Sequence, residues 1–384
     1  MPSSISNSEP AKAGSPRKDS SGDQNRDQHG EIVRQRTIPD QPWSRIALAV
    51  AIAVIAGVVA WEATCRSWGY RPGLDDTNDL WVEARRTVKP DSTVIIGSSR
   101  GLFGLDLNAL EAGLGTRPVQ LALVGSCPYP VLRHLADDPT FHGTVICDTV
   151  PGLLVVPYMA PPYKNAEKAV KRLHTQSWSQ WAGHQLSIPL EQTFACLQQE
   201  DLNLAALLRH VPLPDRPKAQ IGPALPPHFS TIDRDRRTWM LPEVLTDQTL
   251  RDRVKNGWPP LFTPPPKPSW IPEGPFAEFM GKLFNQRFVD MAKAVSDLRA
   301  RGGNVVFVRM PSTGELCKLE ERLTPRAVVW DRLLKDTGSP GIWFEDHPEL
   351  TGFDCPEWSH LSATDSVEFT KRLVPFLKQA LVAR

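Results

Sequence analysis

Two short stretches, far apart in the chain, carry side chains that could perform nucleophilic chemistry together. In the first, Gly97-Ser-Ser99 follows a β-branched run at residues 94–96 that begins after Pro90, which is typical of a buried strand. Ligands collect at the carboxyl ends of the strands of an open parallel sheet, so Ser99 is the candidate nucleophile. Serine is also frequent in turns for conformational reasons, so this stretch alone does not indicate catalysis. The prediction depends mainly on the second stretch.

The second stretch, residues 353–362, holds a histidine just before a predicted helix. His360 stands three residues after Glu357, and Asp354 lies three residues further upstream. A serine nucleophile needs a base to take its proton, and the base needs a carboxylate to hold its tautomer. The pattern therefore predicts Ser99 as the nucleophile, His360 as the base and one of the two carboxylates as the acid.

The two stretches together resemble the SGNH, or GDSL-type, hydrolase superfamily. In that superfamily the serine lies in a Gly-x-Ser block after the first strand, and an Asp-x-x-His block precedes the final helix. The Gly-Ser-Ser-Arg form and the membrane anchor inferred below are similar to its cell-envelope branch, which includes proteins of alginate O-acetylation and teichoic acid D-alanylation. By position, the resemblance implies that Ser99 and His360 are nucleophile and base, with Glu357 at the family's Asp position. It covers roughly Val94 to the C-terminus, with a large interruption.

The resemblance also bears on the oxyanion hole. It implies that Gly125, after the apolar run 119–124, donates a backbone N–H to the oxyanion; a plain strand-to-helix turn is the alternative. The family's third block is Gly-x-Asn-Asp, whereas the corresponding residues 147–152 contain no asparagine. Because loss of one such donor costs about 3 to 4 kcal/mol of transition-state stabilisation, another donor must replace it or activity is weak.

Other polar residues are predicted at the same sheet edge. Arg309 and Ser312 follow or end the predicted strand 304–311, and we expect them to line the substrate site. Arg309 would bind an anionic substrate group or pair with a carboxylate. His347, in Glu-Asp-His-Pro, is the second candidate base, although no comparable motif surrounds it. The cysteine spacing matches no zinc pattern, so neither a metal nor another cofactor is predicted.

The apolar periodicity predicts an α/β fold: a three-layer α/β/α sandwich with a mostly parallel sheet, flavodoxin-like in the wide sense. Strands are predicted at residues 94–96, 119–124, 144–150, 304–311 and 341–344, and helices at 105–114, 130–136, 276–301, 325–335 and from Ser362 onward. Pro375 should kink or shorten the last helix.

A large insertion interrupts this alternation between about residues 155 and 275. Helices are predicted at 166–173 and 190–208. The stretch from Val211 to Pro275 is rich in proline, which predicts irregular structure. A long irregular segment in a compact domain usually covers a site or binds a partner, so we interpret it as a lid or docking surface. Its tryptophans either stack on sugars or pack the insertion against the core: Trp239, Trp258 and Trp270.

The run from Ile46 to Trp61 contains no charged residue. Extended to residues 43–63, it approaches the roughly 20 residues that cross a bilayer as a helix, with Trp43 and Trp61 near the two interfaces. The alternative, a buried helix in a soluble protein, fits less well because the helix has no polar side. Basic residues weakly favour a cytoplasmic N-terminus, which predicts a signal anchor with the bulk of the chain outside.

The predicted organisation has four parts: a disordered tail at 1–42, the transmembrane anchor at 43–63, a linker at 64–89, and the SGNH-like domain at 90–384 with the insertion at about 155–275. An oxidising compartment would permit disulfides among the six cysteines, with buried free thiols as the alternative. The formal net charge of +1 gives no sign of a nucleic-acid-binding surface.

The sequence thus predicts ester chemistry at the cell envelope. The expected protein is a single-pass inner-membrane esterase or O-acyltransferase whose external domain acts on acyl, above all acetyl, esters of an envelope polysaccharide. Its partners would be that polysaccharide or an acyl donor, and a membrane acyltransferase. The competing hypothesis is a non-catalytic envelope protein that keeps the fold and binds polysaccharide or a membrane partner. The missing asparagine and the proline-rich insertion favour this second hypothesis.

Overall fold

The computed structural model describes residues 40–198, 202, 204–209, 226–263 and 272–382. The chain divides into two compact units, one ending at Val58 and one beginning at Val59. The tail that we expect to be disordered, residues 1–42, lies almost entirely outside the described residues, as do Trp270 and much of the proline-rich stretch.

Helix α1 (Trp43–Ser67) contains the predicted membrane span. It has 25 residues, a mean hydropathy of 2.3 over its most apolar window, and no buried residue in that window. At 1.5 Å per residue it covers about 37 Å, more than the roughly 30 Å of a bilayer's hydrocarbon core. Among the described residues it is the one helix long and apolar enough to cross a membrane, and a single-pass anchor is compatible with it.

The second unit is built around a five-stranded parallel sheet with the order β2-β1-β3-β6-β7. If the five strands of this sheet are numbered 1 to 5 along the chain, their order across the sheet is 2-1-3-4-5. This is a common order of doubly wound α/β folds. The α/β fold with a parallel sheet is therefore confirmed. The strands are β1 (Thr93–Ile96), β2 (Val119–Gln120), β3 (Thr144–Asp148), β6 (Asn304–Arg309) and β7 (Gly341–Trp343).

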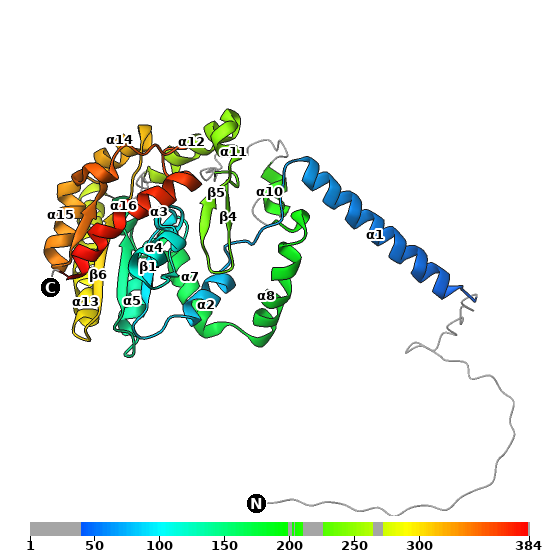
Figure 1. Ribbon diagram of the computed structural model, residues 1–384, viewed down its shortest axis with the longest axis horizontal. Helices are drawn as coiled ribbons and strands as arrows, with labels where there is room; N and C mark the ends of the chain where they lie inside the picture. Colours follow the sequence, from blue (N-terminus) through cyan, green and yellow to red (C-terminus); the bar gives the residue numbers. More distant parts are fainter. Residues whose placement is uncertain (1–39, 199–201, 203, 210–225, 264–271, 383–384) are drawn as a thin grey trace, which may run out of the picture. The chain divides into compact units, whose positions relative to one another are not determined.

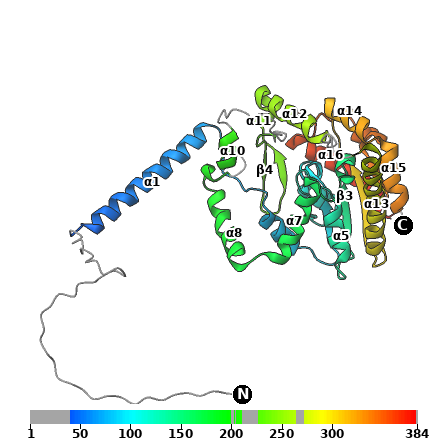
Figure 2. The same ribbon diagram turned by 180° about the vertical axis from the view of Figure 1, so that it is seen from behind.

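Helices cover both faces of the sheet because successive strand residues point to opposite sides. Val94 and Ile96 enter one apolar core, whereas Ile95 enters the other. The face turned toward the viewer in Figure 2 packs against α2 (Asn78–Arg86), α5 (Tyr129–Asp137), α7 (Pro161–Thr175), α13 (Glu273–Arg299) and α15 (Arg326–Thr337). The opposite face, turned forward in Figure 1, packs against α3 (Ser99–Gly104), α4 (Leu107–Leu114) and α16 (Ala363–Val382).

The predicted helices differ from the structure in two places. The single helix predicted over 190–208 is replaced by separate elements: the end of α8 (Trp178–Glu191), a 3-10 turn (Ala195–Leu197) and α10 (Leu204–Arg209). Pro375 does not shorten α16, which continues to Val382. The remaining connections include α6 (Pro151–Leu154), α14 (Gly314–Leu323) and two 3-10 turns, η2 (Phe344–Asp346) and η3 (Pro348–Leu350).

The segment expected to be a linker, residues 64–89, contributes to the core. Its helix α2 carries Trp81, which is fully buried and whose indole N–H donates a 3.0 Å hydrogen bond to the carbonyl oxygen of Leu121. This contact ties α2 to the chain just after β2. The stretch is therefore part of the α/β domain rather than a tether.

The described part of the insertion is also ordered and packed. It forms the hairpin β4 (Ser230–Ile232) and β5 (Thr238–Met240), followed by α11 (Glu243–Thr246) and α12 (Gln248–Phe262). Arg236 in the hairpin is completely buried, pairs with Asp76, and donates to the carbonyl oxygens of Gln120 and Ala122 beside β2. Residues 226–263 are thus built into the domain, which differs from the irregular stretch that the prolines suggest.

All six cysteines lie in described segments, and all are free thiols. Of the two alternatives left by the sequence, the structure therefore has free thiols. Four of them are buried: Cys65, Cys127, Cys147 and Cys355.

Candidate active site

The turn after β1 determines which serine can react. Gly97 has φ of +139°, and a Cβ atom there would lie 2.6 Å from the Cβ of Asp148, so the position requires glycine. Ser98 caps α3: its hydroxyl accepts from the backbone N–H of Arg100 and donates to Asp148 Oδ2 at 2.7 Å. Ser98 is buried in these contacts, whereas Ser99 begins the helix with a half-buried side chain. The geometry therefore favours Ser99 as the reactive hydroxyl.

The histidine and its acid form a buried pair. His360 Nδ1 donates to Glu357 Oε1 at 2.9 Å, and the backbone N–H of His360 donates to the same oxygen. Both side chains are fully buried. Asp354 is exposed instead, and its carboxylate accepts a 3.4 Å hydrogen bond from Thr313. Of the two candidate acids, the structure places Glu357 against the imidazole.

Trp258, from the insertion, completes the surroundings of this acid. Its indole N–H lies 2.6 Å from Glu357 Oε2 and 2.8 Å from the Glu357 carbonyl oxygen. The same indole packs on the imidazole, with ring centroids 5.6 Å apart. From the sequence, Trp258 is expected only to stack on sugars or to pack the insertion against the core. Its contact with the acid is seen only in the structure.

The imidazole ring also packs against apolar rings, one of them from helix α3. Phe103 and Phe229 pack on the ring with centroid distances of 4.4 and 5.5 Å. Phe103 lies one helical turn after Ser99, so both project from the same side of α3. Nε2 of His360 is buried and has no hydrogen-bond partner among the described residues, so it is not bonded to Ser99 here. Catalytic hydrogen bonds are often long without substrate and tighten when it binds.

Gly125 lies at the same edge of the sheet as Ser99. The backbone N–H of Leu123 donates a 3.1 Å hydrogen bond to the Gly97 carbonyl oxygen, which brings this loop beside the end of β1. Gly125 itself has φ of +57°, in the left-handed region. Its position is compatible with the oxyanion role that the resemblance implies and equally with a plain turn.

Asp148 lies in the stretch 147–152, which corresponds to the family's third block and contains no asparagine. Its Oδ2 accepts from both the N–H and the hydroxyl of Ser98, and its Oδ1 is buried without a partner among the described residues. A Cβ on Gly101 would lie 2.6 Å from the Asp148 Cβ, so α3 packs directly on this residue. Asp148 therefore positions the helix and does not replace the missing asparagine as a donor.

Arg309 pairs with a carboxylate, the second of the two roles that the sequence allows, and Ser312 is buried beside it rather than exposed to a substrate. Arg309 donates to Glu320 Oε2 at 2.6 Å and to the Ser312 hydroxyl at 3.0 Å, and all three side chains are buried. Arg100 binds the same carboxylate through two nitrogens, at 3.0 and 2.6 Å, and its Nε donates to Ser359 at 3.3 Å. We call this set, Arg100, Arg309, Ser312, Glu320 and Ser359, the arginine–glutamate network.

This network joins the two halves of the site. Arg100 follows Ser99, and Ser359 precedes His360, so the contact between them fixes α3 against the histidine loop. Burial alone would raise the pKa of Glu320, but the guanidinium groups of Arg100 and Arg309 outweigh it and lower that pKa to about 2. The carboxylate is therefore ionised throughout the neutral range.

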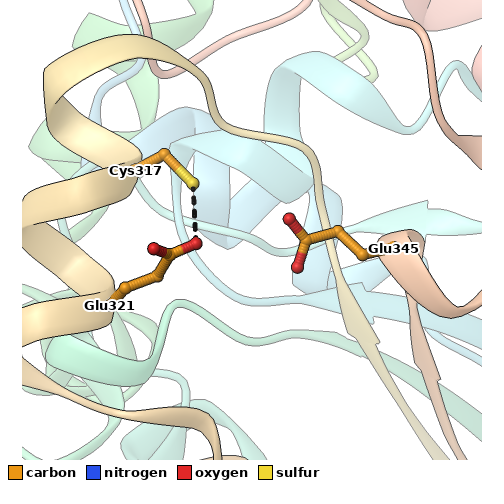
Figure 3. A group of neighbouring side chains, drawn as sticks. All are labelled: Cys317, Glu321 and Glu345. Atoms are coloured by element: carbon orange, nitrogen blue, oxygen red, sulfur yellow. Dashed lines mark hydrogen bonds between the residues drawn. The ribbon is translucent and has the colours of Figure 1, made fainter.

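Two further groups lie outside this arrangement. His347, the second candidate base, packs on Phe376 of α16 with a centroid distance of 4.3 Å. Figure 3 shows Cys317, Glu321 and Glu345, whose ligand atoms all lie within 4.8 Å of one another. Burial raises the pKa of the Cys317 thiol, both carboxylates are exposed, and we assign this group no metal.

A cavity of about 20 Å³ lies along α3, lined by Leu102, Phe103 and residues of the β4-β5 hairpin, which is room for about one water molecule. A much larger groove of about 750 Å³ lies on the opposite face of the sheet, between α2, α5 and α7.

No protein-family model, curated protein or solved structure matches this chain. The function must therefore be argued from the site itself.

Proposed function

We propose that the chain is a membrane-anchored serine esterase or O-acyltransferase of the SGNH type. The observation that carries this proposal is the buried His360–Glu357 pair. Its Nε2 has no partner among the described residues, and its imidazole packs on Phe103 of α3, the helix that Ser99 begins. A carboxylate on Nδ1 sets the tautomer in which Nε2 can accept a proton. The parallel sheet with the order β2-β1-β3-β6-β7 is also compatible with the resemblance.

In the proposed reaction, Ser99 Oγ attacks the acyl carbonyl carbon while His360 Nε2 takes its proton. Glu357 stabilises the resulting imidazolium through Nδ1–H. The tetrahedral intermediate collapses when the proton passes to the departing alkoxide, which leaves an acyl-serine. Water or a sugar hydroxyl then attacks the acyl-serine with His360 again as base, which gives hydrolysis or transfer respectively.

The proposed setting is the cell envelope. If α1 spans the inner membrane with its N-terminus in the cytoplasm, the catalytic domain lies outside, next to envelope polysaccharide. Acetyl esters of such a polysaccharide are the proposed substrates, and a membrane acyltransferase is the proposed partner. The anchor supports this setting because it holds the domain within reach of surface glycans.

A specific observation favours the second candidate function, a non-catalytic binding protein. The stretch 147–152 supplies no asparagine for the oxyanion, and its Asp148 carboxylate accepts hydrogen bonds from Ser98 instead of donating one. The groove of about 750 Å³ between α2, α5 and α7 is lined by Tyr129, Tyr163 and Arg133 and not by Ser99. A polysaccharide would then bind to that groove, and Ser99 would have no part.

Turnover of a simple acyl ester distinguishes the two functions. We expect Ser99→Ala and His360→Ala each to reduce kcat by roughly 10⁶-fold, the loss seen when a triad loses its serine or histidine. Asp354→Asn, on the same loop but exposed, is the matched control and should retain full activity. Ester turnover that survives in Ser99→Ala would exclude this residue as the nucleophile. Adding a soluble glycan as competing acceptor then separates hydrolysis from transfer.

A further inference from the structure

Helix α8 presents an exposed face without charge. Between Trp178 and Leu190 the helix contains no Lys, Arg, Asp or Glu, and its one acidic residue, Glu191, is only 7% exposed. Trp178 and Leu186 are 77% and 70% exposed, and Leu190 is 49% exposed. A surface helix of a soluble domain normally carries charged residues on its outer face, so this face is unusual.

The inner side of α8 is already in contact with the domain. Ile188 is buried in a small cluster with Leu80 of α2, and His184 and Gln185 both bind the carboxylate of Glu83. These contacts fix which face of the helix points outward. The apolar outer face is therefore exposed in the folded domain, because the opposite face of the helix already makes the contacts with the core.

Two tryptophans mark one end of this face. The rings of Trp178 and Trp181 stack with centroids 4.6 Å apart and an interplanar angle of 20°. Indole rings are favoured at membrane–water interfaces because one part is apolar and the N–H remains hydrated. Trp181 lies at the edge of the outer face, since it precedes the inward-facing Ile188 by two helical turns and is 36% exposed. We call Trp178, Leu186 and Leu190, with Trp181 stacked on Trp178 at their edge, the α8 surface.

The chain that follows α8 contacts the last turns of α1. Glu62 accepts hydrogen bonds from the backbone N–H groups of Ala195 and Cys196, at 3.0 and 2.9 Å, and Arg66 donates to the Thr193 carbonyl oxygen at 3.0 Å. The chain just after α8 is therefore attached to the end of the predicted membrane span. Exposed leucines continue the apolar character beyond it: Leu197, Leu204 and Leu208.

We propose that the α8 surface lies in the interface of the same bilayer that α1 spans, with Trp178 and Trp181 at the level of the lipid headgroups. The attachment of residues 193–196 to α1 keeps one end of α8 beside the membrane, and the helix extends only about 20 Å from there. Exposed tryptophan and leucine side chains bind such an interface through burial of their apolar parts, and indole rings are favoured there. A second copy of the chain is a less suitable occupant of the α8 surface. Two α8 surfaces that face each other would be removed from the lipid beside α1.

Brominated lipids test the proposal in the full-length chain. The protein is reconstituted in vesicles of phosphatidylcholine and phosphatidylglycerol, with and without bromine on the upper acyl chain. The difference in emission between the wild type and Trp178→Phe/Trp181→Phe reports the two indoles. We expect this difference to fall in brominated vesicles. Equal emission in both kinds of vesicle overturns the proposal.

A charge-substituted variant gives an independent measurement. In Leu186→Asp/Leu190→Asp, both changes are at exposed positions, so the fold should persist and the quenching of the two indoles should be lost. Val328→Asp, on the exposed side of α15, is the matched control and should leave the quenching unchanged. Absence of quenching together with a cross-linked dimer that Leu186→Asp/Leu190→Asp abolishes would assign the surface to a second copy instead. The proposal is independent of the chemistry at Ser99, so Ser99→Ala should be quenched like the wild type.

Discussion

Replacing Glu320 with glutamine should destabilise the α/β domain by about 3 kcal/mol. The two arginines that hold this carboxylate lower its pKa from 4.5 to about 2. A difference of about 2.5 pKa units between the folded and unfolded states corresponds to about 3 kcal/mol. The glutamine variant keeps the shape but leaves Arg100 and Arg309 buried without their counter-charge, and breaking such a pair typically costs 3 to 5 kcal/mol.

The sign of the pH dependence follows from the lowered pKa. An ionised Glu320 stabilises the folded state fully above about pH 4.5, and this contribution is lost as the pH falls from about 4.5 toward 2. The wild type and Glu320→Gln should therefore differ most near neutral pH and converge in acid.

Urea unfolding in detergent, followed by tryptophan fluorescence, measures this difference. Glu315→Gln, which removes an exposed pair with Lys318 on the same helix, is the matched control and should cost less than about 1 kcal/mol. If Glu320→Gln were as stable as this control at pH 7, the arginine–glutamate network would not hold α3 against the histidine loop, and the reasoning would be refuted.

Three further predictions concern the site and the opposite face. Trp258→Phe removes the indole hydrogen bond to Glu357, and a hydrogen bond to a charged group is worth about 1.5 to 3 kcal/mol. We therefore expect kcat to fall roughly tenfold or more with little change in KM, as measured by steady-state kinetics on an acyl ester. Glu357→Gln should lower kcat about 10⁴-fold while Asp354→Asn has no measurable effect, and equal losses in the two variants would contradict the assignment of the acid. Burial, with smaller contributions from Arg85 and a neighbouring histidine, lowers the pKa of His134 from 6.5 to about 4. The folded state should therefore lose up to about 3 kcal/mol as the pH falls from 6.5 to 4, and urea unfolding of His134→Gln should show a smaller loss.

The parallel sheet could be predicted because its strands carry strong local signals. Residues 94–96 and 144–148 are β-branched or apolar, lie between turn-forming residues, and pair in the structure as expected. Helix α3 lacks such a signal: its sequence, Ser-Arg-Gly-Leu-Phe-Gly, holds two glycines that disfavour a helix. It forms because Gly101 packs closely on Asp148, a contact between residues far apart in the chain.

The site could be predicted only in part for the same reason. The short motifs identify Ser99 and His360 as candidates, but Glu357 and Asp354 are both spaced for an acid, and only the three-dimensional course of the loop distinguishes them. The hydrogen bond from Trp258 joins residues 99 positions apart and comes from a segment whose prolines suggest an irregular loop. Tertiary packing overrides that local signal, since Pro259 and Pro260 lie within α12.

The reactivity of Ser99 toward a phosphonate tests the central claim most directly. The full-length protein in detergent is incubated with a serine-reactive phosphonate and digested, and the modified peptide is identified by mass spectrometry. We predict an adduct on Ser99 that forms much more slowly in His360→Ala and is absent from Ser99→Ala. No adduct on Ser99, or one that forms at the same rate without His360, would contradict the proposed nucleophile and base.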